Sequence, residues 1–284
     1  MKYILSILFI ISMLFSPLPI QGQTRRALVI GVGEQLDKNW AKINGDKDVP
    51  YVTQMLRKCG YKDIKTLVNK QATKSGIISA FKSLTSRCKK GDIVYIHYSG
   101  HGQQVSDVNG DENSDNWDES WIPYDAYLQP CKKDNGEKHL IDDEVVLLLN
   151  EIKNKIGTKG KILVVVDACH SGDSDRNITP PGEDSIVVRG VFNRFILPVK
   201  KNKKTQALPR KWLTLSACKS GQLNQELTKP HVGRLTYALF LLVDEGGISM
   251  EKIKRTMQQN PTLRRQTPEL TNEQTIYNIS DVLR

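Results

Sequence analysis

The chain has 284 residues, of which 39% are hydrophobic and 25% are charged, and its mean hydropathy is −0.41. These are the values of an ordinary globular protein, and they exclude a chain built mainly from membrane-spanning segments. The 41 Lys and Arg residues outnumber the 31 Asp and Glu residues, which gives a formal net charge of +10. Such an excess suits nucleic acid, an anionic surface or simple solubility. No RNP, zinc-finger or helix-turn-helix signature accompanies it, so we expect no nucleic-acid partner.

The first 22 residues have the three-part pattern of a secretory signal peptide. Lys2 precedes an apolar run over residues 3–15, and two prolines follow before the chain reaches Gly22. We therefore predict cleavage near Gly22, a secreted or periplasmic protein, and no stable membrane insertion afterwards. An uncleaved anchor is the alternative, which the prolines and the short apolar run disfavour. A lipoprotein is disfavoured because the first cysteine is Cys59.

After this segment, predicted strands and helices alternate along the chain. Short runs rich in Val, Ile and Leu predict buried strands, and apolar residues three or four positions apart predict amphipathic helices. The predicted strands cover residues 25–33, 64–69, 91–102, 161–172 and 211–218. The predicted helices cover residues 46–60, 74–88, 142–157, 233–247 and 249–259.

This alternation predicts the α/β class, with a mostly parallel sheet covered by helices on both faces. Two segments interrupt it: an acidic loop at about 105–126 and a long loop at about 173–210 that is rich in Pro and Lys. Loops of this length inside a compact domain are usually functional or disordered. We therefore expect one domain over residues 23–284 with two elaborated loops, and not two domains.

The five cysteines of an exported chain leave at least one thiol unpaired. If Cys169 is the free thiol, Cys59, Cys88, Cys131 and Cys218 allow three pairings. Cys59 and Cys88 each follow a predicted helix just before a turn that contains glycine, so this pair is our first choice for a disulfide. The sequence leaves the connectivity open.

Two of the predicted strands end in reactive side chains. The stretch HYSGHG places His101 in a glycine-flanked turn, and DACHSG does the same for Cys169. Ligands bind at the carboxyl ends of the strands in open parallel sheets, so adjacent strands would bring this imidazole and thiol together. A thiol with an ordinary pKa of about 8.5 is mostly protonated, and a neighbouring imidazole supplies the base that activates it. We therefore predict a nucleophile–base pair, with the backbone N–H groups of Gly102 and Cys169 as an oxyanion hole.

A structural interpretation of the same residues is a buried cysteine and a core histidine that happen to end strands. The occurrence of both, each in a matching glycine turn, favours chemistry over that alternative. His97 lies within its strand and is interpreted as structural, and His170 should point away from Cys169. No context marks His139 or His231.

HYSGHG and DACHSG together resemble the two catalytic boxes of the metacaspases, the caspase-like family of clan CD cysteine peptidases. Further matches follow the family in order: ALVIGVG and INGDKDV early, NGDENSDNWDESWIPYDA after the histidine, and LSACKSGQLNQE, GRLTYALF and RRQTPEL later. The resemblance covers essentially the whole chain after the signal segment. It implies a three-layer α/β/α caspase-like fold with a central, mostly parallel sheet of about six strands. It also implies His101 as general base, Cys169 as nucleophile, and no cofactor for the chemistry itself.

The resemblance further implies cleavage after Arg or Lys, because the family's specificity pocket holds acidic side chains. Carried over to this chain, these are Asp167, two residues before the nucleophile, and Asp48, which follows Lys47 where the family has Asn. Two carboxylates pair with a basic substrate side chain and repel the Asp that true caspases accept. Ser99 is expected in the same wall. The structural alternative is that Asp167 orients a neighbouring turn.

A calcium site is another implication of the resemblance. The acidic run DVNGDENSDNWDE does not have the EF-hand spacing. The family's calcium ligands correspond to Asp118, Asp142, Asp143, and Asp175 or Asp173. Calcium would act there as an activator that orders the loop beside the pocket, and not as a catalytic metal. The alternative is a solvated acidic loop, with Asp142 and Asp143 favouring a helix N-terminus.

The basic part of the long loop, residues 200–211, lies where caspase-like folds often carry a processing linker. A run of charges is usually only solvated surface. A peptidase that prefers Arg or Lys would nevertheless be able to cut itself there, or near Arg189 and Arg194. Self-processing is therefore a hypothesis that the sequence raises.

The sequence thus predicts an exported, monomeric cysteine endopeptidase whose partners are protein or peptide substrates with Arg or Lys at the cleaved position. A clostripain- or gingipain-type peptidase would share the nucleophile–base pair and the basic specificity, but the ordered matches favour a metacaspase. A catalytically silent caspase-like scaffold that binds peptides is a non-enzymatic alternative, although a scaffold has no reason to retain His101, Cys169 and Asp167 together. A basic surface-binding protein would explain the charge but not the histidine and the cysteine.

Overall fold

The structure is a computed structural model that describes most of the chain after residue 22. The described ranges are residues 23–107, 110, 117–169, 187–191, 194–197, 209–219, 222–264, 266–271 and 276–284. The predicted signal peptide, His170, Asp173 and Asp175 lie outside them, as does most of the predicted basic loop. Within these ranges, no helix has the length and apolar character needed to cross a membrane.

Six strands form the central sheet, in the order β2-β1-β3-β7-β8-β9. Their bounds are β1 Arg25–Gly31, β2 Asp63–Val68, β3 Ile93–Ser99, β7 Lys161–Asp167, β8 Leu213–Ser216 and β9 Glu269–Thr271. The first five strands in this order pair in parallel, whereas β9 runs antiparallel to β8 at the edge. The prediction of a mostly parallel sheet of about six strands is confirmed.

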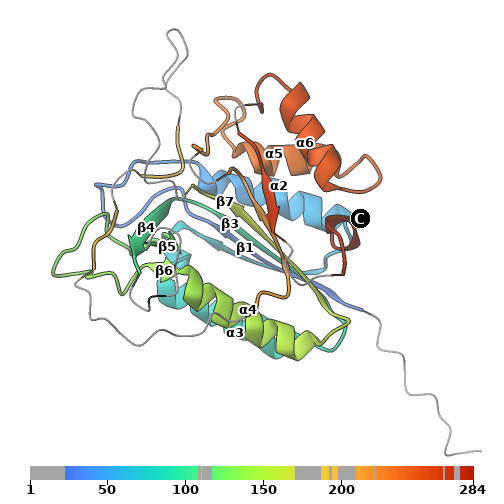
Figure 1. The fold of residues 1–284 in the computed structure, drawn as a ribbon, viewed down its shortest axis with the longest axis horizontal. Coiled ribbons are helices and arrows are strands. Elements are labelled where there is room, and N and C mark those ends of the chain that lie inside the picture. The colour runs from blue at the N-terminus through green and yellow to red at the C-terminus, as the bar shows by residue number, and fades with distance from the viewer. Residues whose placement is uncertain are drawn as a thin grey trace, which may run out of the picture.

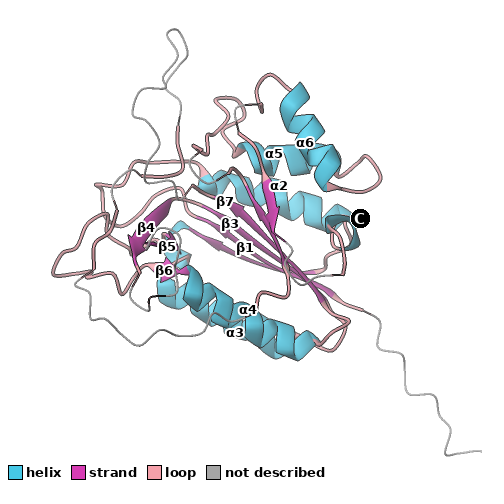
Figure 2. Ribbon diagram, viewed as in Figure 1, coloured by secondary structure: helices cyan, strands magenta, loops and turns pink. Residues whose placement is uncertain are grey.

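Helices cover both faces of this sheet and give the molecule three layers (Figure 1; Figure 2). One face carries α2 (Gly45–Lys58), α5 (Arg234–Leu242) and α6 (Met250–Gln259), and the other carries α3 (Lys74–Arg87) and α4 (Asp142–Ile156). Alternate strand residues fill the two cores, as expected for a sheet buried on both faces. Leu163 of β7 packs in the core beneath α2 and α5, and Val164 in the core beneath α3 and α4. The predicted α/β class and three-layer architecture are confirmed.

A second, antiparallel sheet of three short strands begins directly after β3. It consists of β4 (Gly102–Ser106), β5 (Trp117–Trp121) and β6 (Leu140–Ile141), and the sequence pattern did not predict it because an irregular acidic loop was expected over residues 105–126. Trp121 is 6% exposed and stacks on Tyr98 with the rings 4.7 Å apart, so an apolar residue inside the acidic segment anchors it to the core. Two short 3-10 helices, η1 (Asn69–Gln71) and η2 (Ile279–Asp281), complete the described elements.

The predicted disulfide between Cys59 and Cys88 is wrong. Cys59 packs in the core on the α2 side of the sheet and Cys88 in the core on the α3 side, so the sheet itself separates the two thiols. All five cysteines are free thiols in the structure. Burial raises the pKa of Cys59 above its ordinary value and that of Cys88 to about 11, so both behave as protonated core residues.

Candidate active site

The parallel pairing of β3 and β7 sets the positions of the predicted nucleophile and base. Ser99 at the end of β3 lies opposite Asp167 at the end of β7. His101 and Cys169 each follow two residues later, so the register delivers imidazole and thiol to the same edge of the sheet. This edge, formed by the carboxyl ends of parallel strands, is where ligands bind in this class of fold.

The His101 imidazole is buried and neutral. Its Nε2 lies 2.8 Å from the carbonyl oxygen of Ala41, and because a carbonyl only accepts, Nε2 carries the ring proton. Trp40 covers the ring, with the two ring centroids 5.0 Å apart. Among the described residues, no group forms a hydrogen bond with Nδ1. Burial lowers the pKa of His101 to about 4, so near neutral pH Nδ1 has a lone pair with which to accept a proton.

The Cys169 thiol is buried beside a second cysteine. The Cys169 Sγ donates to the carbonyl oxygen of Gln222 at 3.1 Å, and the Cys218 Sγ donates to the same oxygen at 3.3 Å. Hydrogen bonding with Cys169 raises the pKa of the Cys218 thiol, and burial raises it further. Cys218 is therefore a protonated neighbour, whereas Cys169 is the thiol that follows the end of β7 by two residues.

Two backbone N–H groups converge on one carbonyl oxygen beside the thiol. The Cys169 N–H donates to the oxygen of Arg189 at 2.9 Å, and the Gly102 N–H donates to the same oxygen at 3.3 Å. These are the two donors that the sequence predicts as an oxyanion hole. Two donors aimed at one oxygen polarise the carbonyl group and stabilise the negative charge that develops when a nucleophile adds to its carbon.

The side chains of Asp48, Asp167 and Glu226 form a buried group on the α2 side of the sheet, which we call the acidic pocket. These side chains are at most 1% exposed. Asp167 ends β7, and Asp48 lies in the first turn of α2. Gly45 allows α2 to begin against the end of β3, because a Cβ there would lie 2.5 Å from the carbonyl oxygen of Ser99. The helix start and the strand end thus bring the two predicted pocket residues together.

The guanidinium of Arg189 fills the acidic pocket. It donates to both carboxylate oxygens of Asp48, at 2.6 and 3.1 Å, and lies 3.4 Å from Asp167. The Arg189 Nε–H donates to Glu226 at 2.9 Å. The whole Arg189 side chain is buried, and a buried cation is tolerated only with close ionic partners of this kind. The pocket therefore binds one guanidinium with three carboxylates.

Helix α5 begins at the pocket and supplies further donors to it. The Gly233 N–H donates to Asp48 and the Thr236 N–H donates to Asp167, each at 2.9 Å. The N-terminus of a helix carries partial positive charge, which stabilises carboxylates. Burial raises the pKa of Asp167, but the Arg189 charge and hydrogen bonds outweigh this effect and hold the pKa below its ordinary value. The carboxylate is therefore ionised.

Ser99, which the sequence places in the pocket wall, lies behind Asp48. Its hydroxyl donates to Asp48 at 2.7 Å and lies 2.8 Å from the His97 Nε2. The other ring nitrogen of His97 is 3.0 Å from the Tyr95 hydroxyl, and all three β3 side chains are buried. Ser99 therefore positions a pocket carboxylate, and His97 is part of the hydrogen-bonded interior of the strand.

A family model described as the metacaspase, peptidase C14 domain matches residues 25–174, more than half of the chain. The chain belongs to the metacaspase family. Relatives include Metacaspase-2 of Arabidopsis thaliana, 32% identical over 164 residues, which are 55% of this chain and 36% of the relative. Metacaspase-1 of Schizosaccharomyces pombe is 33% identical over 159 residues, which are 52% of this chain and 34% of the relative. The matched part thus spans about a third of the length of these metacaspases.

Two solved structures have a similar fold. A crystal structure of a Geobacter sulfurreducens protein superposes with a TM-score of 0.64 and 25% identity, covering 92% of this chain and 97% of the other. Caspase-1 of Spodoptera frugiperda superposes with a TM-score of 0.57 and 11% identity, covering 90% and 88% of the two chains, which is a likeness of fold alone. The predicted relation to the metacaspases and their caspase-like fold is confirmed.

The residues predicted to bind calcium do not form a metal site in the part of this metacaspase that the structure describes. Asp118 lies in β5, Asp142 and Asp143 begin α4, and Asp175 is outside the described residues. In the described ranges, no three His, Cys, Asp or Glu side chains form a group that could hold a metal ion. Asp142 accepts a 2.9 Å hydrogen bond from Arg210, so a cationic side chain already pairs with this predicted ligand.

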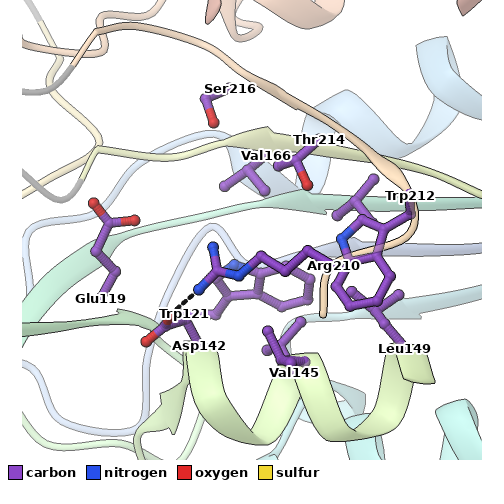
Figure 3. A pocket seen from close by; sticks show the side chains of 12 residues that line it. Glu119, Trp121, Asp142, Val145, Leu149, Val166, Arg210, Trp212, Thr214 and Ser216 are labelled. Carbon is purple, nitrogen blue, oxygen red and sulfur yellow. Dashed lines mark hydrogen bonds and ion pairs between the residues drawn. The ribbon is translucent and has the colours of Figure 1, made fainter. Parts of the chain in front are cut away.

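This ion pair spans a hollow on the opposite face of the sheet from the acidic pocket (Figure 3). Apolar side chains of α4 and β7, among them Val145 and Val166, line it, and Glu119 lies at the same hollow. Val166 packs in the core on the α3 side, whereas the neighbouring Asp167 belongs to the acidic pocket. The hollow therefore lies on the other face of the sheet from the acidic pocket, and we assign it no part in catalysis.

Two residues of the acidic pocket were not assigned to it from the sequence: Glu226 and Arg189. Glu226 lies in the stretch LSACKSGQLNQE, which the sequence marks as a family landmark without a role. Arg189 lies in a loop that is interpreted only as a source of cleavage sites. The run VVRGV was the available signal: a basic residue followed by a glycine, inside a short β-prone stretch, is a peptide that a peptidase of basic specificity could bind.

Proposed function

We propose that the chain is a cysteine endopeptidase that cleaves peptide bonds after Arg or Lys, with Cys169 as nucleophile and His101 as general base. One observation carries the proposal: Arg189 lies as a substrate residue would. Its carbonyl oxygen is held by the two N–H donors beside Cys169, and its guanidinium fills the acidic pocket. Membership of a family of cysteine peptidases supports the type of reaction.

In the proposed reaction, His101 Nδ1 takes the proton from Cys169 Sγ while the sulfur attacks the substrate carbonyl carbon. The N–H groups of Gly102 and Cys169 stabilise the charge that develops on the oxygen. His101 then gives the proton to the leaving amine, the C–N bond breaks, and a thioester remains. Water, deprotonated by His101, hydrolyses the thioester and regenerates the thiol.

The acidic pocket accounts for the proposed specificity. A basic side chain is neutralised there by Asp48 and Asp167, whereas an Asp side chain would add a fourth carboxylate to three. Arginine has an Nε–H at the position that Glu226 binds, and lysine has donors only on Nζ. The pocket therefore favours Arg over Lys by one charge-assisted hydrogen bond.

The proposal also includes export, which rests on the sequence of residues 1–22, a monomeric enzyme, protein or peptide substrates, and no nucleic-acid partner. Self-processing after a basic residue follows from the same specificity. Calcium enters the proposal as an activator and takes no part in bond cleavage. Because Arg210 pairs with Asp142, this arginine would compete with calcium for the Asp142 carboxylate.

Hydrolysis of fluorogenic peptides that end in Arg, Lys or Asp tests the proposal, with calcium or a chelator in parallel. We expect hydrolysis after Arg and, more slowly, after Lys, with none after Asp. Cys169→Ala should abolish activity, and Cys131→Ala, which removes a partly exposed thiol outside the site, should leave it unchanged.

Three outcomes would contradict parts of the proposal. Activity that survives in Cys169→Ala would overturn the mechanism. Preference for Asp would overturn the assignment of the acidic pocket. Binding of Arg peptides without any hydrolysis would support the silent scaffold in place of the enzyme.

A further inference from the structure

The residues that follow Arg189 run alongside the small antiparallel sheet. Gly190 pairs in parallel with Gly102, the first residue of β4, and Phe195 pairs in parallel with Val105 of the same strand. Addition of an extended segment to free backbone groups is a general way to bind a peptide. Because Arg189 lies as a substrate residue would, this segment shows where the part of a substrate after the cleaved bond can lie.

The side chain of Val191 packs against a group of apolar residues beside the active site, which we call the leaving-side cluster. Its members are Trp40, Ile122, Ala126 and Leu128. The first three are at most 5% exposed, whereas Leu128 and Val191 are partly buried. Val191 is the second residue after Arg189, so it occupies the place of the second residue after the cleaved bond.

Hydrogen bonds between two loops hold the leaving-side cluster together. Trp40 lies between β1 and α2, and its Nε1–H donates to the carbonyl oxygen of Ala126 at 3.1 Å. Asp37, in the same loop as Trp40, accepts a 3.0 Å hydrogen bond from the Leu128 N–H. These bonds do not involve Val191. The cluster is therefore a preformed surface, and an apolar side chain that binds to it loses little free energy in ordering the protein.

The leaving-side cluster also adjoins the proposed general base. The Trp40 ring lies over the His101 ring, with the centroids 5.0 Å apart. The Ile122 N–H donates to the carbonyl oxygen of His101 at 3.2 Å. An apolar side chain on the cluster would thus exclude water beside the imidazole that gives its proton to the leaving amine.

We propose that the leaving-side cluster is a specificity subsite that selects an aliphatic side chain at the second position after the cleaved bond. The inference rests on the proposed peptidase function and extends its specificity to residues beyond the bond. Val191 carries it, because this side chain is already packed on the cluster at the required distance along the chain from Arg189. Burial of apolar surface favours such a residue, and a polar group that finds no partner there is disfavoured.

Internally quenched peptides that contain Arg-Gly-X test the inference, with X as Val, Thr, Ala or Asp. Glycine is kept after the arginine because a Cβ added to Gly190 would lie 2.9 Å from the Cys169 Cβ. The purified full chain is assayed for kcat/KM, and product masses identify the bond that is cut. An Arg-terminated fluorogenic peptide, which has no residue at the second position, measures the peptidase function by itself.

We expect the Val peptide to have the highest kcat/KM. The Ala peptide should be cut about tenfold less efficiently, because it buries two fewer methyl groups. The Thr peptide has the shape of the Val peptide but carries a hydroxyl without a partner, so it should also lose about tenfold. The Asp peptide should be poorer than either. The comparison of Val with Thr separates apolar burial from the backbone preference that both β-branched residues share.

A variant of the cluster locates the effect. Leu128→Ala should reduce the ratio of the Val to the Ala peptide from about tenfold to about threefold or less, because part of the apolar surface is lost. Leu147→Ala is the matched control, since Leu147 is an exposed residue of α4 outside the cluster, and it should keep the wild-type ratio. Both peptides are measured on one preparation, so a smaller fraction of folded enzyme cancels in the ratio.

The outcomes separate this inference from the function on which it rests. Equal kcat/KM for the Val, Thr and Ala peptides would overturn it, and would show that Val191 packs on the cluster only because the chain tethers it there. An unchanged ratio in Leu128→Ala would overturn the assignment to the cluster. In both cases hydrolysis after Arg would leave the peptidase function standing. Absence of hydrolysis of every peptide, including the Arg-terminated one, would overturn the peptidase function and the inference together.

Discussion

The proposed catalytic residues, His101 and Cys169, and the acidic pocket are both buried, yet they are held by different forces. His101 is neutral, and its contact, like that of Cys169, is with a backbone carbonyl oxygen. The acidic pocket instead gathers three carboxylates around the Arg189 guanidinium and the start of α5. Backbone geometry is sufficient for the first arrangement, whereas the second also requires a balance of charge.

This difference means that the three carboxylates of the acidic pocket need a counter-charge. Buried carboxylates without a counter-charge are costly, so a cation or water must compensate them in every state of the enzyme. His101 and Cys169 need no counter-charge, because their partners are backbone carbonyl oxygens. Changes among the catalytic residues should therefore alter the rate for every substrate, and changes in the pocket should alter the choice among substrates.

The largest effect on this choice is expected from Asp48→Asn, which keeps the shape of the side chain and removes its charge. Loss of one partner from a buried ion pair costs about 3–5 kcal/mol, so kcat/KM for Arg peptides should fall by about 100-fold or more. Asp46→Asn, in the same first turn of α2 but outside the pocket, is the matched control and should keep the wild-type value. Similar losses in both variants would show that the pocket charge does not decide specificity.

A second effect is expected on the free energy of unfolding, because two further histidines are buried as neutral imidazoles. Burial lowers the pKa of His97 and of His139 to about 4, compared with about 6.5 for an unfolded histidine. Above pH 6.5 neither state is protonated at these rings. As the pH falls from about 6.5 towards 4, the unfolded chain takes up protons that the folded chain does not, so the free energy of unfolding decreases. The loss between pH 7 and 5 should be about 2 kcal/mol for each such histidine.

Urea denaturation of two histidine variants measures this effect. His139→Gln should flatten the pH dependence, because glutamine retains a donor for the Gln103 oxygen that lies 2.9 Å from Nε2 and does not titrate. His231→Gln changes an exposed residue and should leave the pH dependence as it is in the wild type. If both variants lose stability with pH as the wild type does, burial of His139 is not the cause.

A smaller effect is expected from Glu226→Gln, which removes one charge from the acidic pocket. A hydrogen bond to a charged group contributes about 1.5–3 kcal/mol, so kcat/KM for Arg peptides should fall by about tenfold or somewhat more. Lys peptides should be affected less, because lysine has no Nε–H that could donate a hydrogen bond to Glu226. Parallel kinetics with both peptides measure the ratio, and an equal loss for both would contradict the role of Glu226 in distinguishing them.

The smallest effect concerns calcium, on the face of the sheet away from the pocket. If Asp142 is a calcium ligand, Arg210→Ala should lower the calcium concentration needed for activation by about fivefold or less, since an exposed ion pair contributes about 0–1 kcal/mol. Lys211→Ala, next along the chain, is the matched control and should leave this concentration unchanged. A calcium response that is identical in Arg210→Ala and Asp142→Asn would show that Asp142 does not bind the ion.

The positions of His101 and Cys169 could be predicted from the sequence because strand periodicity and parallel pairing together determine which residues share an edge. Asp48 and Asp167 could be predicted only through resemblance to a family, since nothing in the spacing of a helix and a strand indicates that their carboxylates meet. The start of α2 at Gly45, tight against β3, is the packing detail that brings them together.

Other features could not be predicted because they depend on contacts between distant segments. The sequence placed Cys59 and Cys88 at similar helix ends but could not show that the sheet lies between them. The acidic segment has no strand-like run of apolar residues, yet β5 forms because Trp121 reaches the core. Glu226 and Arg189 belong to segments that acquire a role only when backbone pairing brings them to the same pocket.

The position of β8 and β9 in the sheet has a consequence for what a processed molecule would look like. A cut after Arg189 would leave β1, β2, β3 and β7 on one polypeptide and β8 and β9 on the other, while β7 and β8 remain hydrogen-bonded neighbours. The two pieces would share one sheet and one set of cores, so neither could leave without exposing apolar surface. Processed material should migrate as two bands on a denaturing gel and elute as a single species, of unchanged size, from a native column.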